Sequence, residues 1–283
     1  MREPLSRTFV AALLTLAAST APAFAQQRPL WEFGLGAIGL TLPDYRGANQ
    51  NQEYLFPLPY FIYRGEYFRA DREGIRGVFF DSDRVEVNLS LWATPPVKSD
   101  RNSARQGMPN LNPTVEIGPS LNLTLARDLK RECRLALRLP VRAAIATDIS
   151  HTQSAGVVFY PNLNLDLRPE FLGGRWDLGL TAGPFWASRP YNEYFYGVPQ
   201  QFATPERPAF TAAGGYSGAT FIAGITRRFD KLWIGAYVRY DNLKGAVFDD
   251  SPLFKRDYSV AAGIGFAWVF AESDRKVVVD VPF

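Results

Sequence analysis

The sequence predicts an all-β protein, a transmembrane antiparallel β-barrel of twelve strands. Three observations lead to this prediction. The chain opens with an export signal, many segments alternate apolar and polar residues, and the connections between those segments alternate between short and long. Alternation with a period of two puts successive side chains on opposite faces of a strand. A water-soluble β-sandwich shows the same period, so compartment and strand length must decide between the two.

Residues 1–25 have the features of a cleaved secretory signal peptide. Two arginines precede an apolar run over 9–18, and Ala23-Phe24-Ala25 forms a small-x-small cleavage site. The apolar run is too short for a spanning helix, which needs about 20 residues. No Cys lies at the cleavage site to accept a lipid. We therefore expect an exported mature chain that starts at Gln26 and has no lipid anchor.

Composition excludes several classes of protein. Removal of Arg2, Glu3 and Arg7 changes the formal net charge from +3 to +2, whereas nucleic-acid-binding proteins usually carry a strong basic excess. Cys133 is the only cysteine, so no intrachain disulfide can form. No apolar run after the signal is long enough to cross a membrane as a helix. An exported chain of this size is compatible with one all-β domain.

The first five strands are expected at 31–40, 54–63, 67–72, 75–80 and 85–93. The fifth reads VEVNLSLWA, in which four aliphatic residues alternate with a carboxylate, an amide, a hydroxyl and an indole. The short third and fourth strands require a tight outer turn at Glu73-Gly74 and an inner turn over 81–83. If 67–80 folds over the rim instead of spanning, the barrel has ten strands.

The seven later strands are expected at 114–125, 134–145, 157–168, 176–184, 219–226, 232–240 and 258–270. Many of these two-faced segments have the length of a tilted strand that crosses the hydrocarbon layer, about 9–11 residues. Strands of soluble domains are usually shorter, about 5 or 6 residues. Because backbone groups in lipid must all be paired, the strands have to close into a barrel. The aliphatic face then meets lipid, and the polar face lines the lumen.

The connections support an even strand number. Outer-membrane barrels have short periplasmic turns and longer extracellular loops. Long connections are expected near 41–53, 94–113, 146–155, 187–215 and 242–256, and short turns at 64–66, 126–131, 169–174 and 229–231. Twelve strands place both ends of the barrel in the periplasm.

The two-faced pattern stops at Phe270. We therefore predict a barrel domain over 26–270 and a C-terminal periplasmic extension over 271–283. The alternative is that Phe283 supplies the aromatic end of a displaced last strand.

Five segments, spread in order over nearly all of the mature chain, resemble the MipA/OmpV family of outer-membrane proteins. They are PDYRG (43–47), LFPLPYFIYRGEYF (55–68), GMPNLNPTVEIGPSL (107–121), YNEYFYGV (191–198) and DSPLFKRDYSVAAGIGF (250–266). The resemblance implies an outer-membrane barrel that acts as a scaffold linking a lytic transglycosylase to a bifunctional murein synthase. The positions singled out in these segments are Pro43, Asp44, Tyr45, Gly47, Pro57, Pro59, Gly107, Met108, Gly118, Tyr191, Tyr194, Tyr196, Asp250, Ser251 and Pro252.

Most of these positions have a structural interpretation. Gly47 and Gly107 permit positive φ in loops, and the pair of prolines in 55–68 predicts a bulge or an irregular rim. The tyrosines of 191–198 fit either anchors at the membrane boundary or a packed outer loop that folds into the mouth. A partner-binding role is the remaining interpretation.

The polar strand faces predict a network of charges in the lumen. Unpaired buried charges are costly, so these carboxylates and guanidinium groups are expected to pair. Such a network either fills and rigidifies the lumen or forms a constriction that selects a small solute. The residues expected to form it are Glu86, Glu116, Arg134, Arg138, Arg142, Asp166, Arg168 and Arg239.

No catalytic or metal-binding constellation is evident. His151 is the only histidine and lies in DISHTQS, a predicted outer loop in which a base and a nucleophile would lack fixed geometry. One His and one Cys give no metal-ligand spacing. We predict a protein without catalytic residues, metal or cofactor.

The functional prediction follows from the resemblance. It is a non-enzymatic scaffold in the outer membrane, whose partners are outer-membrane lipid and, on the periplasmic side, murein synthases and lytic transglycosylases. No nucleic acid is expected, and no oligomeric state is indicated. The alternative is a narrow channel for small solutes, with anions as candidates because of the three arginines in 134–142.

Overall fold

The computed structural model describes residues 26–71, 74–128, 132–148 and 152–279. The predicted signal peptide at 1–25, Glu73, His151 and the last four residues of the predicted extension lie outside the described residues.

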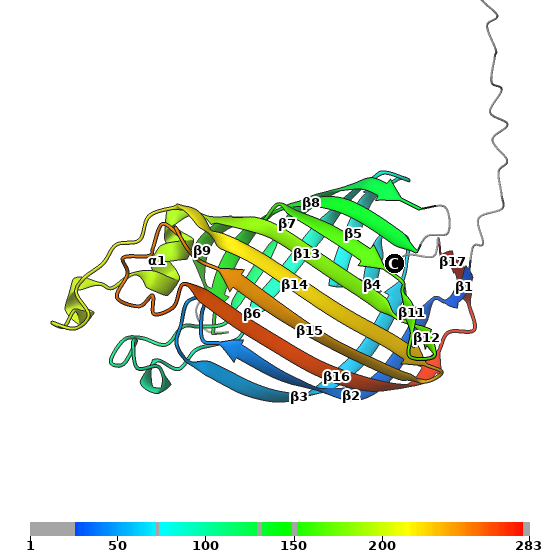
Figure 1. The fold of residues 1–283 in the computed structure, drawn as a ribbon, viewed down its shortest axis with the longest axis horizontal. Coiled ribbons are helices and arrows are strands. Elements are labelled where there is room, and N and C mark those ends of the chain that lie inside the picture. Colours follow the sequence, from blue (N-terminus) through cyan, green and yellow to red (C-terminus); the bar gives the residue numbers. More distant parts are fainter. Residues whose placement is uncertain (1–25, 72–73, 129–131, 149–151, 280–283) are drawn as a thin grey trace, which may run out of the picture.

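The structure is a closed antiparallel barrel of twelve strands, as predicted (Figure 1). The main sheet has thirteen strands, of which β9 and β10 follow one another along a single position between β8 and β13. Pairing of β16 with β2 joins the last strand to the first. The strands of the wall are β2 (Trp31–Pro43), β3 (Asn51–Arg64), β4 (Phe68–Asp71), β5 (Gly74–Asp81), β6 (Val85–Thr94), β7 (Thr114–Arg127), β8 (Cys133–Thr147), β9 (Thr152–Phe159), β10 (Asn162–Leu167), β13 (Asp177–Ala187), β14 (Gly215–Phe229), β15 (Leu232–Asn242) and β16 (Tyr258–Glu272).

Two local predictions are wrong on one side of the barrel. The predicted strand 157–168 is interrupted at Tyr160-Pro161, where proline has no N–H to donate to a ladder. The predicted long loop 146–155 is mostly strand, because β8 and β9 pair as far as Thr147 and Thr152. Small polar residues continue this ladder beyond the point at which the two-faced pattern is visible in the sequence.

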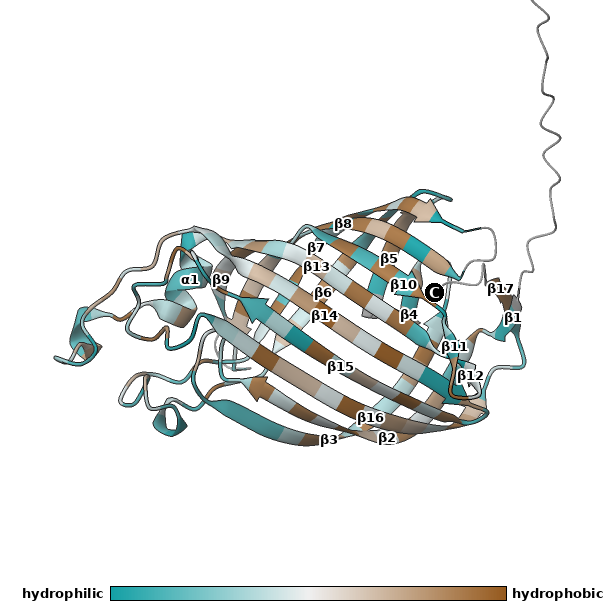
Figure 2. Ribbon diagram, in the orientation of Figure 1, coloured by the Kyte–Doolittle hydropathy of each residue, from teal (hydrophilic) through white to brown (hydrophobic). Residues whose placement is uncertain are grey.

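The outer surface of the barrel is apolar. Large hydrophobic side chains are exposed there, such as Leu35, which is 57% exposed, and Ile264, which is 70% exposed. Aromatic side chains contact one another near both ends, for example Phe33 with Phe270 and Phe159 with Trp186. Brown and pale residues alternate along the strands in Figure 2. Such a lipid-facing band flanked by aromatic girdles is typical of outer-membrane barrels.

Both termini of the described chain lie at one end of the barrel (Figure 1). There β1 (Gln26–Pro29) pairs with β17 (Lys276–Val279) in a separate two-stranded sheet, and β11 (Glu170–Phe171) pairs with β12 (Gly174–Arg175) in a short hairpin. The short connections after β3, β5 and β14 lie at this end, which identifies it as the periplasmic end. The last wall strand, β16, ends at Glu272, two residues beyond the predicted barrel boundary.

The opposite end carries the long connections and the short helices. These are η1 (Ser99–Arg101), α1 (Arg189–Tyr196) and η2 (Gln200–Phe202). No helix in the described residues has the length and apolar character needed to span a membrane.

The wall from β3 to β6 is paired only near the periplasmic end. β3 pairs with β4 only through Tyr63 and Arg64, and β6 pairs with β5 only over 86–88. In the described ranges, 51–62 of β3 and 89–94 of β6 have no strand partner on the sides that face β4 and β5. We call these two facing edges the seam.

Pro57 and Pro59 lie on the seam. Arg64 donates its backbone N–H to the oxygen of Leu30, on the β2 side, and alternate residues of a strand bond to opposite neighbours. Odd-numbered residues of β3 therefore direct their backbone nitrogens toward the seam, where proline loses no ladder bond. The register between β2 and β3 is continuous, so of the two predicted alternatives the bulge is wrong, and the unpaired edge corresponds to the irregular rim. The prolines belong to an unpaired edge, which is where strands tolerate them.

Candidate functional site

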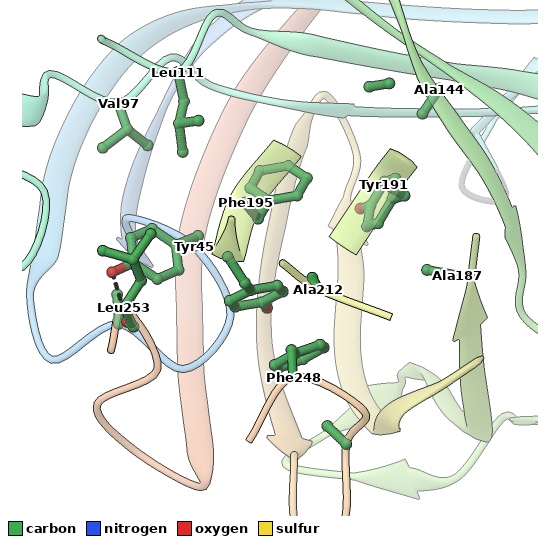
Figure 3. Packing of buried hydrophobic residues seen from close by; sticks show 14 of the residues in the cluster. Tyr45, Val97, Leu111, Ala144, Ala187, Tyr191, Phe195, Ala212, Phe248 and Leu253 are labelled. Carbon is green, nitrogen blue, oxygen red and sulfur yellow. Dashed lines mark hydrogen bonds between the residues drawn. The ribbon is translucent and has the colours of Figure 1, made fainter. Parts of the chain in front are cut away.

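A hydrophobic core built from loops fills the outer mouth of the barrel. It draws on four outer connections, 44–50, 95–113, 188–214 and 243–257, and we call it the plug. Figure 3 shows Tyr45, Phe195, Phe248 and Leu253, which come from three of these connections and pack into one cluster. Phe248 and Leu253 are fully buried, so these loops pack as tightly as the interior of a soluble domain.

Helix α1 supplies the aromatic centre of the plug. Tyr191 and Phe195 are four residues apart and therefore lie on the same face of the helix. The ring of Tyr196 stacks on Phe248 with centroids 3.6 Å apart. The Tyr196 hydroxyl donates to the oxygen of Arg46 at 2.8 Å, which ties α1 to the first outer loop.

Polar groups satisfy the plug's buried backbone. The Tyr45 hydroxyl donates to the oxygen of Leu253 at 2.8 Å (Figure 3), and the Ser251 hydroxyl donates to the oxygen of Tyr196 at 2.7 Å. The side-chain amide of Asn102 also donates to Asp44 Oδ2 at 2.6 Å. Since buried polar groups are costly when unpaired, these bonds fix how the loops are arranged.

The residues singled out by the family resemblance converge in this plug. Asp44, Tyr45 and Gly47 belong to its first connection, which Pro43 at the end of β2 directly precedes. Gly107 and Met108 belong to its second, Tyr191, Tyr194 and Tyr196 to its third, and Asp250, Ser251 and Pro252 to its fourth. Gly47 and Gly107 have φ of 83° and 81°. Among the interpretations of the tyrosines, the structure matches the packed outer loop, because Tyr191 and Tyr196 are buried.

Burial perturbs the titration of the plug tyrosines. Desolvation raises the pKa of Tyr45, Tyr191 and Tyr196 above the ordinary value of 10.0. For Tyr191 the neighbouring carboxylate of Glu116 adds to this effect. Its hydroxyl donates to Glu116 Oε1 at 3.0 Å, which links the plug to the barrel wall.

Three of the singled-out residues, Gly118, Pro57 and Pro59, lie in the barrel wall away from the plug. Gly118 is a point of close approach between β7 and β8, since a Cβ there would lie 2.0 Å from the oxygen of Val141. The two prolines lie on the seam described above.

Beneath the plug lies a cavity of about 370 Å³, which is within the range of small-molecule sites, about 300–1,000 Å³. The plug roofs it through Tyr45, Tyr191 and Tyr196, and wall strands supply Phe56, Trp92 and Phe185. The charged residues that line it are Asp44, Arg46, Glu116, Arg142, Arg239 and Asp241.

One charge cluster of the cavity centres on Asp241, which is 1% exposed. Arg46 Nε lies 3.3 Å from its Oδ1, and Arg239 Nε lies 3.1 Å from its Oδ2. The hydroxyl of Thr220 donates to Oδ1 at 2.6 Å. Burial disfavours the charge of Arg46, but the Asp241 carboxylate, Tyr196 and Tyr191 together outweigh this effect, so the pKa of the guanidinium is raised.

A second cluster joins β7 and β8. Arg142 Nε donates to Glu116 Oε2 at 2.9 Å, and its Nη1 donates to the hydroxyl of Ser90 at 3.3 Å. Arg142 and Glu116 are both buried. The two charges are therefore paired with each other, and Tyr191 fills the remaining position on the carboxylate.

The other predicted charges lie deeper, toward the periplasm, in separate clusters. Asn122 donates to Glu86, and Arg69 and Arg76 lie within ion-pair distance of it. Arg134 pairs with Asp166 at 3.2 Å, and Arg168 with Asp177 at 3.0 Å. Arg138 lies on β8, between Arg134 and Arg142 along the strand. It is in register with Asn122 of β7 and Asn162 of β10. The predicted residues thus occupy two levels of the lumen.

Sequence reasoning missed Asp241 and Arg46. Asp241 follows Arg239 by two residues and so lies on the same strand face, but the predicted strand ended at Tyr240. Arg46 comes from a loop, where no periodicity marks a side chain that enters the lumen. A third missed cluster, Glu32 with Arg64 and Arg228, lies at the periplasmic end.

The described residues contain no group of three or more His, Cys, Asp or Glu side chains placed to hold a metal ion. The clusters found are carboxylate–guanidinium pairs, which suit structural pairing or recognition of a polar group.

Comparisons with known proteins agree with this architecture. Residues 35–270 match the family profile described as MltA-interacting protein MipA. The chain is 29% identical over 220 residues to outer membrane protein OmpV of Vibrio cholerae, covering 74% of this chain and 76% of OmpV. It is 27% identical over 251 residues to outer membrane protein Omp26La of Vibrio anguillarum, covering 85% and 86% of the two chains. These relatives are named as outer membrane proteins, not as enzymes.

Among solved structures, similar chains are a bacterial polysaccharide outer membrane secretin and the NanC porin. Their TM-scores are 0.45 and 0.38 at 9% and 8% identity, over 85% and 83% of this chain and 99% and 98% of theirs. Likeness at this level supports no argument about function. The sequence relatives and the barrel itself place the protein in the outer membrane.

Proposed function

Because the chain belongs to the MltA-interacting protein MipA family, we propose that it is a non-enzymatic outer-membrane scaffold for murein-synthesising and murein-hydrolysing enzymes. The family description, which names an interaction with MltA, and the resemblance described above support an enzyme that acts on murein as the class of partner. The barrel supplies the anchor, and its periplasmic rim is the part within reach of such enzymes.

The observation that carries this proposal is the terminal sheet of β1 and β17. Among the described residues it is separate from the wall and has two strands, so each strand has one edge without a strand partner in that part of the chain. Free edges are templates for added strands, a common mode of peptide recognition. Val278 is 65% exposed on this sheet. The sheet therefore offers both backbone partners and an apolar contact to a periplasmic protein.

The test is retention of purified murein enzymes by the barrel in detergent. We expect a lytic transglycosylase and a bifunctional murein synthase to be retained by the wild type and lost on Val278→Pro, which removes an N–H from the edge. Glu206→Ala, in an outer loop at the opposite end, is the matched control and should retain them. Failure of the wild type to retain either enzyme would contradict the scaffold proposal.

The second candidate is a narrow channel, and the arginine-lined cavity is the observation that favours it. The plug opposes it, since buried loops fill the outer mouth. Planar-bilayer conductance of wild type and Arg138→Glu separates the two functions. Stable openings with changed ion selectivity in the variant would support transport, and a silent bilayer with folded protein would exclude it.

A further inference from the structure

The cavity beneath the plug reaches the seam in the wall. Phe56 on β3 and Trp92 on β6 belong to its lining, and they stand on the two strands whose facing edges are unpaired. Both residues are even-numbered, and the even-numbered side chains of β3 and β6 point into the barrel. They are nevertheless 45% and 41% exposed, whereas the inward Ser120 on fully paired β7 is 4% exposed. Both side chains are thus accessible where the cavity meets the unpaired edges of β3 and β6.

An unpaired strand edge at membrane depth is costly unless something covers it. Pro57 and Pro59 remove two of the N–H groups that would face the seam, but the carbonyl groups of this edge remain. Leu55, on the outward face beside them, is 80% exposed. The seam is therefore apolar at its mouth and retains hydrogen-bond acceptors along its edge.

The inner part of the cavity has unused hydrogen-bonding capacity. In the described structure the hydroxyl of Tyr160, Asp44 Oδ1, Asp241 Oδ2 and the Nε atoms of Arg46 and Arg239 are buried without a hydrogen-bond partner. Arg46 and Arg239 form ion pairs with Asp241 but lack hydrogen-bond geometry at Nε. Donors and acceptors are both present, so a complementary ligand must both accept and donate.

The charge balance defines the ligand further. Arg46, Arg142 and Arg239 face Asp44, Glu116 and Asp241 across the same cavity, so the lining is formally neutral. A ligand with net charge would enter a buried site without a counter-charge, which is unfavourable. Hydroxyl groups donate and accept at once and carry no charge.

We propose that this cavity binds the head of a single-chain amphiphile with an uncharged, hydroxyl-bearing head group, which enters from the membrane through the seam. The head hydroxyls meet Tyr160 and the Asp241 cluster beneath the plug. The hydrocarbon tail passes between Phe56 and Trp92 and remains in the lipid outside. This binding site is independent of the scaffold function proposed above, which uses the opposite end of the barrel.

The experiment uses the full-length barrel in phosphatidylcholine vesicles, free of alkyl glycoside detergent. The probe is a dibrominated stearoyl glycerol, whose bromines quench tryptophan on contact. Subtracting the signal of Trp92→Phe isolates quenching of Trp92 from that of lipid-facing tryptophans. We expect this difference to saturate at one probe per barrel. Dibromostearate, with an ionised head, and its methyl ester, with no donor, should each bind about tenfold more weakly.

Tyr160→Phe tests the cavity floor. It removes a hydroxyl that has no hydrogen-bond partner, so the fold should be unchanged while glycerol-ester binding weakens about fivefold. Tyr240→Phe, on the lipid-facing side, is the matched control and should bind like wild type. Folding of each variant is checked by circular dichroism. A linear, unsaturable signal, tighter binding of the ionised probe, or wild-type affinity of folded Tyr160→Phe would each overturn the proposal.

Discussion

Two parts of the barrel wall use the same alternating pattern and reach different degrees of closure. From β13 to β16, ladders run along almost the full length of each strand, whereas from β3 to β6 they are confined to the periplasmic end. The difference arises from the length of β4 and β5, which have 4 and 8 residues. Barrel closure thus requires only one paired end, and the other end is free to form an opening.

The largest expected effect is on the free energy of unfolding. It compares a charge pair in the fully paired wall with one in the partly paired wall from β3 to β6. Glu116→Gln leaves Arg142 buried without its counter-charge, which should lower the free energy of unfolding by about 3–5 kcal/mol. Asp81→Asn removes the exposed partner of Arg69 at the periplasmic end of the β4–β5 hairpin and should change the free energy of unfolding by about 0–1 kcal/mol. Urea unfolding of both variants in vesicles gives the comparison. Equal losses would show that the β4–β5 hairpin is as constrained as the full wall.

The next effect tests the direction of the backbone at the seam. Leu58→Pro removes a backbone N–H that bonds to β2, so a carbonyl of β2 loses its partner. Because an unpaired carbonyl in lipid costs roughly several kcal/mol, this variant should be strongly destabilised. Pro57→Ala adds an N–H on the seam side and should cost about 1 kcal/mol or less. Folded yield and thermal unfolding measure both. A severe defect in Pro57→Ala alone would contradict the assigned edge.

A smaller effect measures how closely the strands approach. Gly118→Ala places a Cβ 2.0 Å from a backbone oxygen of β8 and should destabilise by about 1–3 kcal/mol. Gly77→Ala, on β5, meets nothing nearer than 3.8 Å and should be tolerated. Thermal unfolding midpoints, compared with wild type, distinguish the two. The idea of a looser wall fails if Gly77→Ala is the more damaging change.

The smallest effect concerns the plug that roofs both walls, and it depends on pH. Buried Tyr45, Tyr191 and Tyr196 keep their protons above pH 10.0, while the same residues ionise in an unfolded plug. Stability from these groups is therefore complete below about pH 10 and falls as pH rises further. Protease access to 188–214 should increase above that pH, before the barrel unfolds. Access that is independent of pH would contradict this linkage.

The strand periodicity made most of the wall predictable, because one face must meet lipid along every strand. It failed where small polar residues extend a ladder, as at Thr152, and where strands continue past the visible alternation, as at Asp241. The seam could not be predicted, since the alternation marks faces and does not say which edges pair. The prolines of β3 are the available signal, and on their own they predict a bulge or an irregular rim without saying which.

The plug shows why half of the site was missed. Tyr45, Phe195 and Phe248 lie in connections without a regular period, so no pattern marks them as buried. The resemblance located the segments but not their contact with one another. Arg46 enters the cavity from such a segment, whereas Glu116 and Arg142 were identified because they lie on strands.

The terminal sheet ties the order of assembly to the order of the chain. β1 directly precedes β2, β17 directly follows β16, and β2 pairs with β16. Pairing of β2 with β16 therefore brings β1 and β17 together and favours closure of the clasp, the two-stranded sheet that they form. A polypeptide halted before β16 would keep β1 as an open strand edge in the periplasm, exposed to proteases and chaperones. A paired β1–β17 sheet is therefore expected only in a barrel that contains its last wall strand.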